Sequence, residues 1–291
     1  MNTAGVLVPI ITPFAADGRV DADALRRLAE RFIEAGVAGI VACGTTGEYY
    51  ALEDDERELV LRTVAEATRG RVTAIAGINA LSTTQAIRNA QQAEALGYDG
   101  LMLSTPPYSL PEQAGIAQHF RTVAQATKLP IIMYDFPARV GVQIAIETVI
   151  ELARIPNIVG IKESSGSFNR ALALIQANIP DFDIISGSDD MAADFLFWGV
   201  RSWISGGANV FPGEQAAMVK AADDGRWDEV RRLMSGMYPV IQAMESGDYN
   251  QKAKLGCRRH GIEAGPVRQP LAPLSEQDER AFLALLDAYQ G

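Results

Sequence analysis

The feature that most constrains the fold of this chain is an alternation of short apolar runs with longer amphipathic segments, which continues to about residue 205. Eight of the apolar runs are rich in Val, Ile or Leu and do not alternate with polar residues, as expected of parallel strands covered on both faces. They are residues 5–11, 38–43, 71–77, 98–104, 129–134, 157–162, 182–187 and 202–207. Eight strand and helix units in one chain predict a closed (β/α)8 TIM barrel of the α/β class.

The amphipathic segments between these runs have the sequence signals of helix ends. Residues 21–36 and 82–97 carry apolar residues at helical spacing, begin with Asp or Ser, and end with Gly. Residues 212–291 are expected to form further helices, so we divide the chain into a barrel at 1–211 and a C-terminal helical extension at 212–291. An open doubly wound sheet is the alternative, but residues 12–18, TPFAADG, lack the glycine fingerprint that would follow its first strand.

Charge and cysteine content argue against several classes of protein. The net charge of −10 and the pI near 4.8 leave no basic stripe for nucleic acid. Cys43 and Cys257 are too few for a disulfide framework, and with His119 and His260 they show no zinc-site spacing, so no metal is expected. Residues 1–14 have no basic leader, and no apolar run approaches the roughly 18 residues of a membrane span. We therefore expect a cytoplasmic protein without nucleic acid or membrane partners.

Lys162 is the most unusual charged residue, because it ends an apolar run. A buried ammonium is costly unless it is paired, or unless its pKa falls far enough for the amine to be neutral. A neutral amine is a nucleophile toward carbonyl groups. Taken alone, Lys162 could also extend to solvent or pair with Glu163. The other four lysines are expected to be solvated, in polar or helical surroundings: Lys128, Lys220, Lys252 and Lys254.

Several polar residues are predicted to lie at the same end of the barrel as Lys162, because reactive groups of such barrels come from the C-terminal ends of the strands. Residues 44–48, GTTGE, follow the second strand and offer hydroxyls and N–H groups for a carboxylate. Tyr134 ends the fifth strand, Arg139 in the next turn suits a second anion, and Tyr108 follows the fourth strand. Each of these could be a turn, a packed aromatic residue or a surface charge, but together they predict an active site.

Four motifs, GTTGE, YDFPARVG, GIKESSG and GPVRQPL, resemble in order and spacing those of the dihydrodipicolinate synthase and N-acetylneuraminate lyase family. The similarity covers nearly the whole chain. It implies a (β/α)8 barrel with C-terminal helices, class I aldolase chemistry without metal or organic cofactor, and a homo-oligomer, a tetramer built from two tight dimers. It also implies that Lys162 forms a Schiff base with a 2-oxo acid substrate.

The resemblance also implies roles for the other residues at this end of the barrel. Tyr134 matches the tyrosine that relays protons to and from the bound 2-oxo acid, and Thr45 matches the threonine of that relay. In the synthase branch, Tyr108 matches the tyrosine that reaches into the neighbouring subunit's site, and Arg139 matches the arginine that binds the second substrate's carboxylate. The other positions implied to bind substrate are Gly44, Thr46, Gly187 and the backbone of Ile204.

Departures from both branches leave the substrate open. Pro107 stands where the synthase commonly has the first of two adjacent tyrosines, and residues 247–256, GDYNQKAKLG, replace a segment of the NP.PVK type. The lyase branch usually has Ser-Thr in place of Thr45 and Thr46, and lacks the arginine turn. We expect a Schiff-base lyase that acts on pyruvate or a longer 2-oxo acid by aldol cleavage or condensation, dehydration or deamination. The alternatives are 4-hydroxy-tetrahydrodipicolinate synthase, which condenses pyruvate with aspartate semialdehyde, and a non-catalytic barrel that binds small acids.

Overall fold

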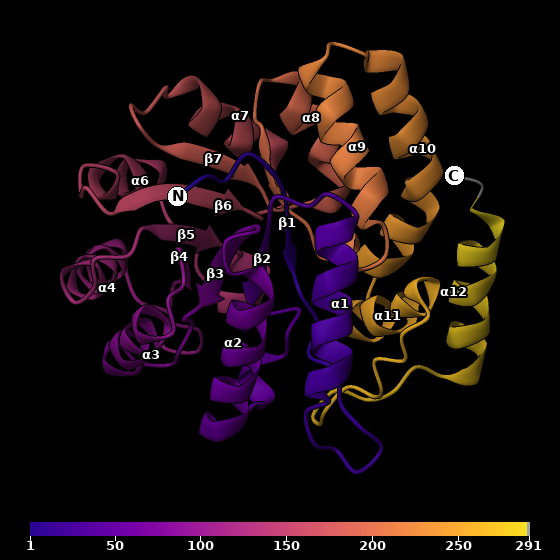
Figure 1. The fold of residues 1–291 in the computed structure, drawn as a ribbon. Coiled ribbons are helices and arrows are strands. Elements are labelled where there is room, and N and C mark those ends of the chain that lie inside the picture. The colour runs from indigo at the N-terminus through magenta and orange to yellow at the C-terminus, as the bar shows by residue number, and fades with distance from the viewer. Residues whose placement is uncertain (290–291) are drawn as a thin grey trace.

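The computed structural model describes residues 1–289 and confirms the (β/α)8 barrel, because eight parallel strands pair in chain order and β8 pairs with β1 (Figure 1). The strands are β1 (Gly5–Pro9), β2 (Gly39–Ala42), β3 (Thr73–Gly77), β4 (Gly100–Ser104), β5 (Ile131–Asp135), β6 (Ile158–Glu163), β7 (Asp183–Ser186) and β8 (Ser202–Ile204). Each overlaps one of the eight predicted apolar runs.

The helices alternate with the strands and then continue beyond the barrel. They are α1 (Ala22–Glu34), α2 (Asp54–Thr68), α3 (Thr83–Ala95), α4 (Gln113–Gln125), α5 (Pro137–Val140), α6 (Ile146–Leu152), α7 (Phe168–Gln176), α8 (Ala192–Phe197), α9 (Pro212–Asp223), α10 (Trp227–Glu245), α11 (Tyr249–Gly256) and α12 (Glu276–Ala288). Short 3-10 turns are η1 (Tyr49–Ala51), η2 (Asp189–Met191), η3 (Gly206–Asn209) and η4 (Cys257–His260). No helix within residues 1–289 is long and apolar enough to cross a membrane.

The predicted helix starts are capped as their sequences suggest. The Asp21 carboxylate accepts a hydrogen bond from the Ala24 N–H at 2.9 Å, and the Ser82 hydroxyl accepts one from the Gln85 N–H at 3.2 Å. Such caps satisfy backbone donors that have no partner inside the helix. They fix where α1 and α3 begin, and so where the loops that precede them end.

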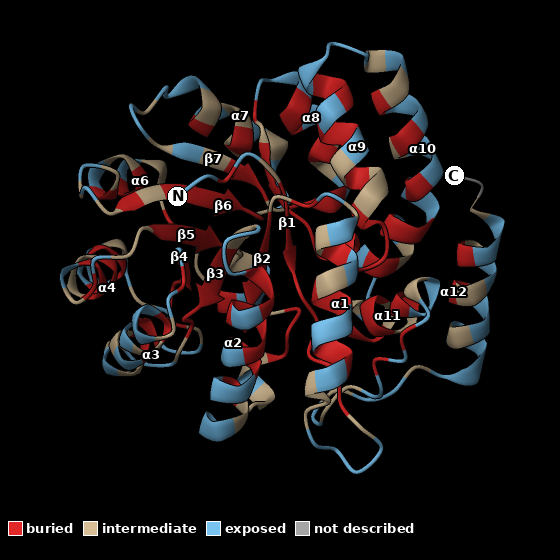
Figure 2. Ribbon diagram, viewed as in Figure 1, coloured by how far each residue is buried: buried red, intermediate tan, exposed pale blue. Residues whose placement is uncertain are grey.

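Buried side chains form two layers, one inside the barrel and one between the strands and the helices. Along each strand, alternate residues face inward. The inner layer consists of Leu7, Val41, Ile75, Met102, Ile132, Tyr134, Ile185 and Ile204. Figure 2 shows the strands almost entirely buried and the outer faces of the helices exposed, so the barrel interior is filled and any ligand must bind at its ends.

The C-terminal helices lie together on one side of the barrel, in orange and yellow in Figure 1. α9 contacts both β1 and α10, and α12 packs against α10 and α11. The helices expected in residues 212–291 are observed, within the described part of the chain, as α9, α10, α11 and α12. The division of the chain at residue 211 stays a prediction, because α9 contacts the barrel and the extension alike.

Candidate active site

A cavity of about 490 Å³ opens at the C-terminal ends of the strands, where the active site was predicted. Of the predicted site residues, six line it: Thr45, Thr46, Tyr134, Arg139, Lys162 and Gly187. Tyr134 and Lys162 lie on β5 and β6 themselves, and the other four residues lie in the segments that follow β2, β5 and β7. The first turn of α11 and the end of α10 close one side of the cavity. Segments 205 residues apart therefore meet here, since Asn250 Nδ2 donates a hydrogen bond to the Thr45 carbonyl at 3.3 Å.

Lys162 lies on the inner face of β6, directly beside Tyr134 of β5 in the strand register. Its side chain is buried, and its Nζ atom is 4.4 Å from the centroid of the Tyr134 ring. Burial lowers the pKa of Lys162 to about 8, although the carboxylates of Asp189 and Glu245 act to raise it. At neutral pH a useful fraction of this lysine is therefore an uncharged amine, as a nucleophile toward a carbonyl must be.

Tyr134 is buried beside this amine and keeps its phenolic proton. Burial raises the pKa of Tyr134 well above its ordinary value of 10, and hydrogen bonding to Ser164 and Thr45 acts in the opposite direction. The phenol is thus a neutral group able to pass a proton between Lys162 and a bound substrate through its hydroxyl partners.

Gly187 leaves the space that the lysine occupies. A Cβ atom at this position would stand 2.8 Å from Lys162 Cγ and 2.8 Å from the Glu163 carbonyl oxygen. Any larger residue would therefore displace the lysine side chain or the end of β6. The Gly187 N–H also donates to the Glu163 carbonyl at 2.9 Å, which holds the start of this loop against β6.

The turn after β2 presents Thr45 and Thr46 to the cavity, but its glutamate has a structural function. The Glu48 side chain is fully buried, and its Oε1 lies 2.6 Å from Lys254 Nζ on α11. Its Oε2 accepts a hydrogen bond from the Arg268 N–H at 2.9 Å. The expectation that Lys254 is solvated was wrong, because tertiary packing brings it to this carboxylate, and Glu48 and Lys254 together fix the turn.

Asp189 is a site residue that the sequence reasoning did not identify. Its Oδ1 accepts from Trp203 Nε1 at 3.0 Å, and its Oδ2 accepts from the Gly207 N–H at 2.8 Å and the Tyr249 hydroxyl at 2.6 Å. These donors are all neutral, and Asp189 acts to raise the pKa of Lys162. Ser164 and Glu245, which line the cavity, were also missed. The run of acids after the seventh strand, in SGSDD, was the available signal.

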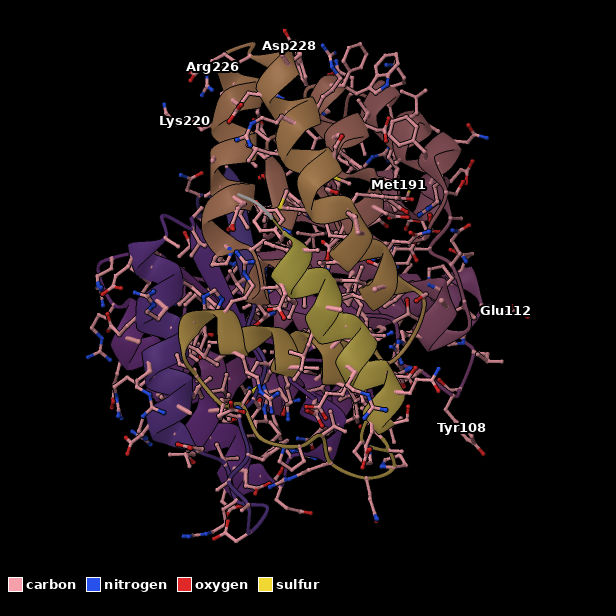
Figure 3. The ribbon with its side chains drawn as sticks, turned by 90° about the vertical axis from the view of Figure 1, so that its right-hand side faces the viewer. Tyr108, Glu112, Met191, Lys220, Arg226 and Asp228 are labelled. Carbon is pink, nitrogen blue, oxygen red and sulfur yellow. The ribbon has the colours of Figure 1, made fainter. Side chains whose placement is uncertain are left out.

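Three predicted site residues do not line the cavity of the single chain. Tyr108 is 93% exposed and projects away from the molecule, as Figure 3 shows. Its function in a neighbouring subunit stays a prediction. Gly44 precedes Thr45 in the turn after β2, and a Cβ atom there would meet Met102 at 3.6 Å. Ile204 is fully buried in the inner layer of the barrel.

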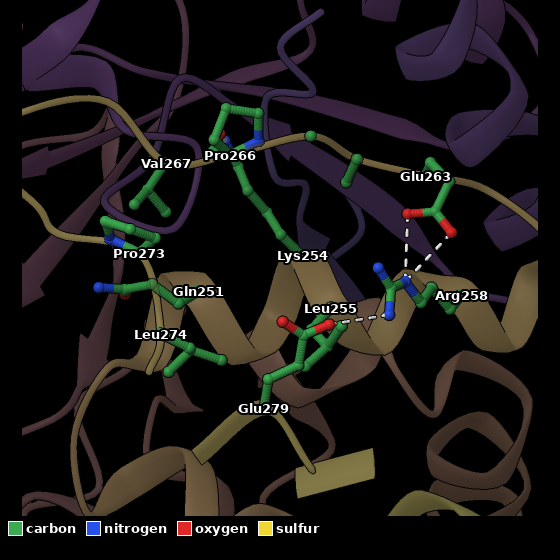
Figure 4. Close-up of a pocket in the computed structure, with 12 residues that line it drawn as sticks. Gln251, Lys254, Leu255, Arg258, Glu263, Pro266, Val267, Pro273, Leu274 and Glu279 are labelled. Atoms are coloured by element: carbon green, nitrogen blue, oxygen red, sulfur yellow. Dashed lines mark hydrogen bonds and ion pairs between the residues drawn. The ribbon is translucent and has the colours of Figure 1, made fainter. Parts of the chain in front are cut away.

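A second cavity, of about 220 Å³, lies beside α11 and α12 (Figure 4). None of the predicted site residues lines it. Its charged groups are paired with one another, since Arg258 contacts both Glu263 and Glu279 at 3.1 Å. Lys254 borders it, but the Lys254 ammonium is bound to Glu48 and to the Pro266 carbonyl. We therefore assign the chemistry to the cavity at the barrel mouth. No group of His, Cys, Asp and Glu within residues 1–289 could hold a metal ion.

Comparison with known proteins gives one consistent result. Residues 2–289 match the model of the dihydrodipicolinate synthetase family. The 4-hydroxy-tetrahydrodipicolinate synthase of Pelobacter propionicus is 38% identical over 285 residues, which cover 98% of each chain. The corresponding enzyme of Methanosarcina barkeri is 37% identical over 273 residues, which cover 94% of this chain and 93% of that one.

Solved structures show the same likeness. Dihydrodipicolinate synthase of Acinetobacter baumannii, determined in complex with pyruvate, superimposes with a TM-score of 0.95 at 34% identity over 98% of each chain. A dihydrodipicolinate synthase of Bacillus anthracis superimposes with a TM-score of 0.96 at 29% identity over the whole of both chains. The chain therefore belongs to the dihydrodipicolinate synthetase family and is a lyase of the class I aldolase type.

Proposed function

We propose that Lys162 forms an imine with the keto carbon of pyruvate or of a longer 2-oxo acid. The observation that supports this most directly is the buried Lys162, whose pKa is lowered to about 8 and whose amine packs against the Tyr134 ring at the cavity floor. The complete group of Lys162, Tyr134 and Thr45 argues against a barrel that only binds small acids.

The reaction begins when the Lys162 amine adds to the keto carbon to give a carbinolamine. Tyr134 donates a proton to the carbinolamine hydroxyl, which leaves as water, and recovers one through Thr45. Thr46 and the N–H groups of the turn after β2 hold the substrate carboxylate, so that the keto carbon faces the amine. The protonated imine then accepts the electron pair released when a C3–H or C3–C4 bond breaks. No metal or organic cofactor is required for these steps.

A second, narrower candidate is the condensation of pyruvate with aspartate semialdehyde, the 4-hydroxy-tetrahydrodipicolinate synthase reaction. Arg139 lines the cavity and is available for the carboxylate of a second substrate. The curated relatives with this name, at 38% and 37% identity, support the same reaction. Pro107, which departs from the tyrosine pair of that branch, favours a different 2-oxo acid.

The experiment that tests the proposal is borohydride reduction in the presence of pyruvate, followed by mass spectrometry of the intact protein and of its peptides. We expect one reduced pyruvate adduct on Lys162 and none on a Lys162→Ala variant. Absence of an adduct with pyruvate and with a panel of longer 2-oxo acids would contradict the proposal. Turnover of aspartate semialdehyde with pyruvate, compared with turnover of the panel, decides between the two reactions.

Assembly and location belong to the same proposal. We infer a tetramer built from two dimers in which Tyr108 enters the partner's site, and a cytoplasmic protein. The exposed Tyr108 and the family membership support the first part. The two buried free cysteines, Cys43 and Cys257, are compatible with a reducing compartment.

A further inference from the structure

The C-terminal ends of β5 and β6 are connected by an ion-pair network. It lies on the outer face of these strands, whereas Tyr134 and Lys162 face the cavity from the inner face. β5 ends at Asp135, one residue after Tyr134, and β6 ends at Glu163, one residue after Lys162. The register pairs Tyr134 with Lys162 and Asp135 with Glu163. Because side chains alternate along a strand, the two carboxylates face outward, toward the helices.

Arg170 of α7 contacts both of these carboxylates. Its Nη2 lies 2.8 Å from Asp135 Oδ2, and its Nε lies 3.1 Å from Glu163 Oε2. All three side chains are buried: Arg170 is 9% exposed, Asp135 0% and Glu163 2%. The Arg170 Nε donates a hydrogen bond to Glu163, and Nη2, which contacts Asp135 as an ion pair, donates to the Ile144 carbonyl. Because a guanidinium presents its donors in a fixed plane, this one arginine connects the two strand ends.

The remaining oxygens of both carboxylates are bound by backbone donors near the same strand ends. Asp135 Oδ1 accepts from the Ile144 N–H at 3.1 Å, and Glu163 Oε1 accepts from the Ser165 N–H at 2.8 Å. The network therefore also holds the loops that leave β5 and β6. These loops carry Arg139 and Ser164 to the cavity.

We propose that Arg170 is a positioning residue, which holds Tyr134 and Lys162 in the geometry for proton transfer by bridging the residue that follows each of them. The inference rests on the proposed function, because it assigns the proton relay to Tyr134 and the imine to Lys162. Catalysis is sensitive to displacements of about 1 Å. At this level the β5–β6 ladder ends with one backbone hydrogen bond, from the Ser164 N–H to the Asp135 carbonyl at 2.9 Å, and the ion pairs add a side-chain connection between the two strand ends.

The test uses Arg170→Lys, which keeps the positive charge between the two acids but loses the planar, two-armed contact. The readouts are the rate at which borohydride traps the pyruvate adduct on Lys162, the KM for pyruvate, and the melting temperature. We expect trapping to slow by about tenfold or more, with KM changed by no more than about threefold, because the carboxylate site after β2 is untouched. Arg121→Lys, which affects an exposed ion pair between α4 and α6, is the matched control and should leave all three unchanged.

A second set of variants guards against misfolding of Arg170→Lys. Asp135→Asn and Glu163→Gln each remove one charged arm while keeping the side-chain shape. If Arg170 works only when it is bound at both ends, the protein with both Asp135→Asn and Glu163→Gln should trap the adduct no more slowly than the slower single variant. If the two reductions in trapping rate multiply in the double variant, the proposal is overturned. A folded Arg170→Lys protein with normal trapping overturns it too. A wild-type protein that forms no adduct overturns the proposed function, and the positioning assignment with it.

Discussion

At the level of single residues, Lys162 and Lys254 are both buried, yet their surroundings give them different chemistry. Burial lowers the pKa of Lys254 to about 8 as well, but its ammonium pairs with the Glu48 carboxylate at 2.6 Å and does not line the cavity at the barrel mouth. Lys162 makes no ion pair within the described part of the chain, and burial lowers its pKa to about 8. Its nearest charges are those of Asp189 and Glu245, which oppose that shift without cancelling it.

The pH dependence of imine formation follows from this pKa. The lysine reacts as the neutral amine, so the rate of reductive trapping with pyruvate and cyanoborohydride should rise with pH and level off above about 8. At pH 7 about a tenth of the lysine is neutral. A rate that rises steadily to the ordinary lysine pKa of 10.5 would show that the site does not depress it.

Asp189→Asn should move this profile to lower pH. The aspartate raises the pKa of Lys162, so its loss leaves burial less opposed. The control is Asp223→Asn, which removes an acid that pairs with Arg201 on the outer side of the barrel. This change should leave the midpoint of the pH profile of trapping unchanged. An Asp189→Asn midpoint at or above that of the wild type would contradict this assignment.

At the level of elements, α11 is joined to the turn after β2 by a buried ion pair rather than by apolar packing alone. The side chains of Lys254 and Glu48 are 2% and 0% exposed. Lys254 Nζ also donates to the Pro266 carbonyl at 2.7 Å and lies 4.0 Å from the centroid of the Phe14 ring. The turn that presents Thr45 and Thr46 therefore depends on a helix about 200 residues later in the chain.

Lys254→Met should destabilise the protein by about 3–5 kcal/mol, because it leaves the Glu48 carboxylate buried without its cation. Urea unfolding measures the loss. Lys220→Met is the control, since Lys220 is 74% exposed and its pair with Asp224 is 3.7 Å long. That change should cost about 0.5 kcal/mol or less. Equal losses from the two variants would mean that the ion pair does not support the fold.

At the level of the whole molecule, the cavity of one chain is lined by Lys162, Tyr134 and Thr45 but not by Tyr108. This residue is 93% exposed on the loop after β4, and Leu110 beside it is 56% exposed. A symmetric dimer would exchange such loops between two equivalent sites. The proposed assembly is thus a way to complete each site, and it can be tested without a structure of the oligomer.

Mixed subunits provide the test. Lys162→Ala and Tyr108→Phe should each be nearly inactive as pure proteins. If Tyr108 acts in the partner's site, a dimer with one subunit of each kind has one intact site out of two. Unfolding and refolding the two variants together makes about half of the dimers mixed, so about a quarter of the wild-type activity should return. The same mixture without refolding is the control. No recovery would place Tyr108 in the site of its own chain, and an active pure Tyr108→Phe protein would place it outside catalysis.

The sequence by itself determined the barrel, the strand ends and most of the site, because apolar runs, caps and strand-end residues are local patterns. Lys162, Tyr134, Thr45, Thr46, Arg139 and Gly187 all reached the cavity as predicted. Only the tertiary structure decided which charges are neutralised. The partners of Lys254, Asp189 and Arg170 come from other units of the barrel or from the C-terminal helices. Contacts between segments so far apart depend on how the helices close around the strands, which no local pattern records.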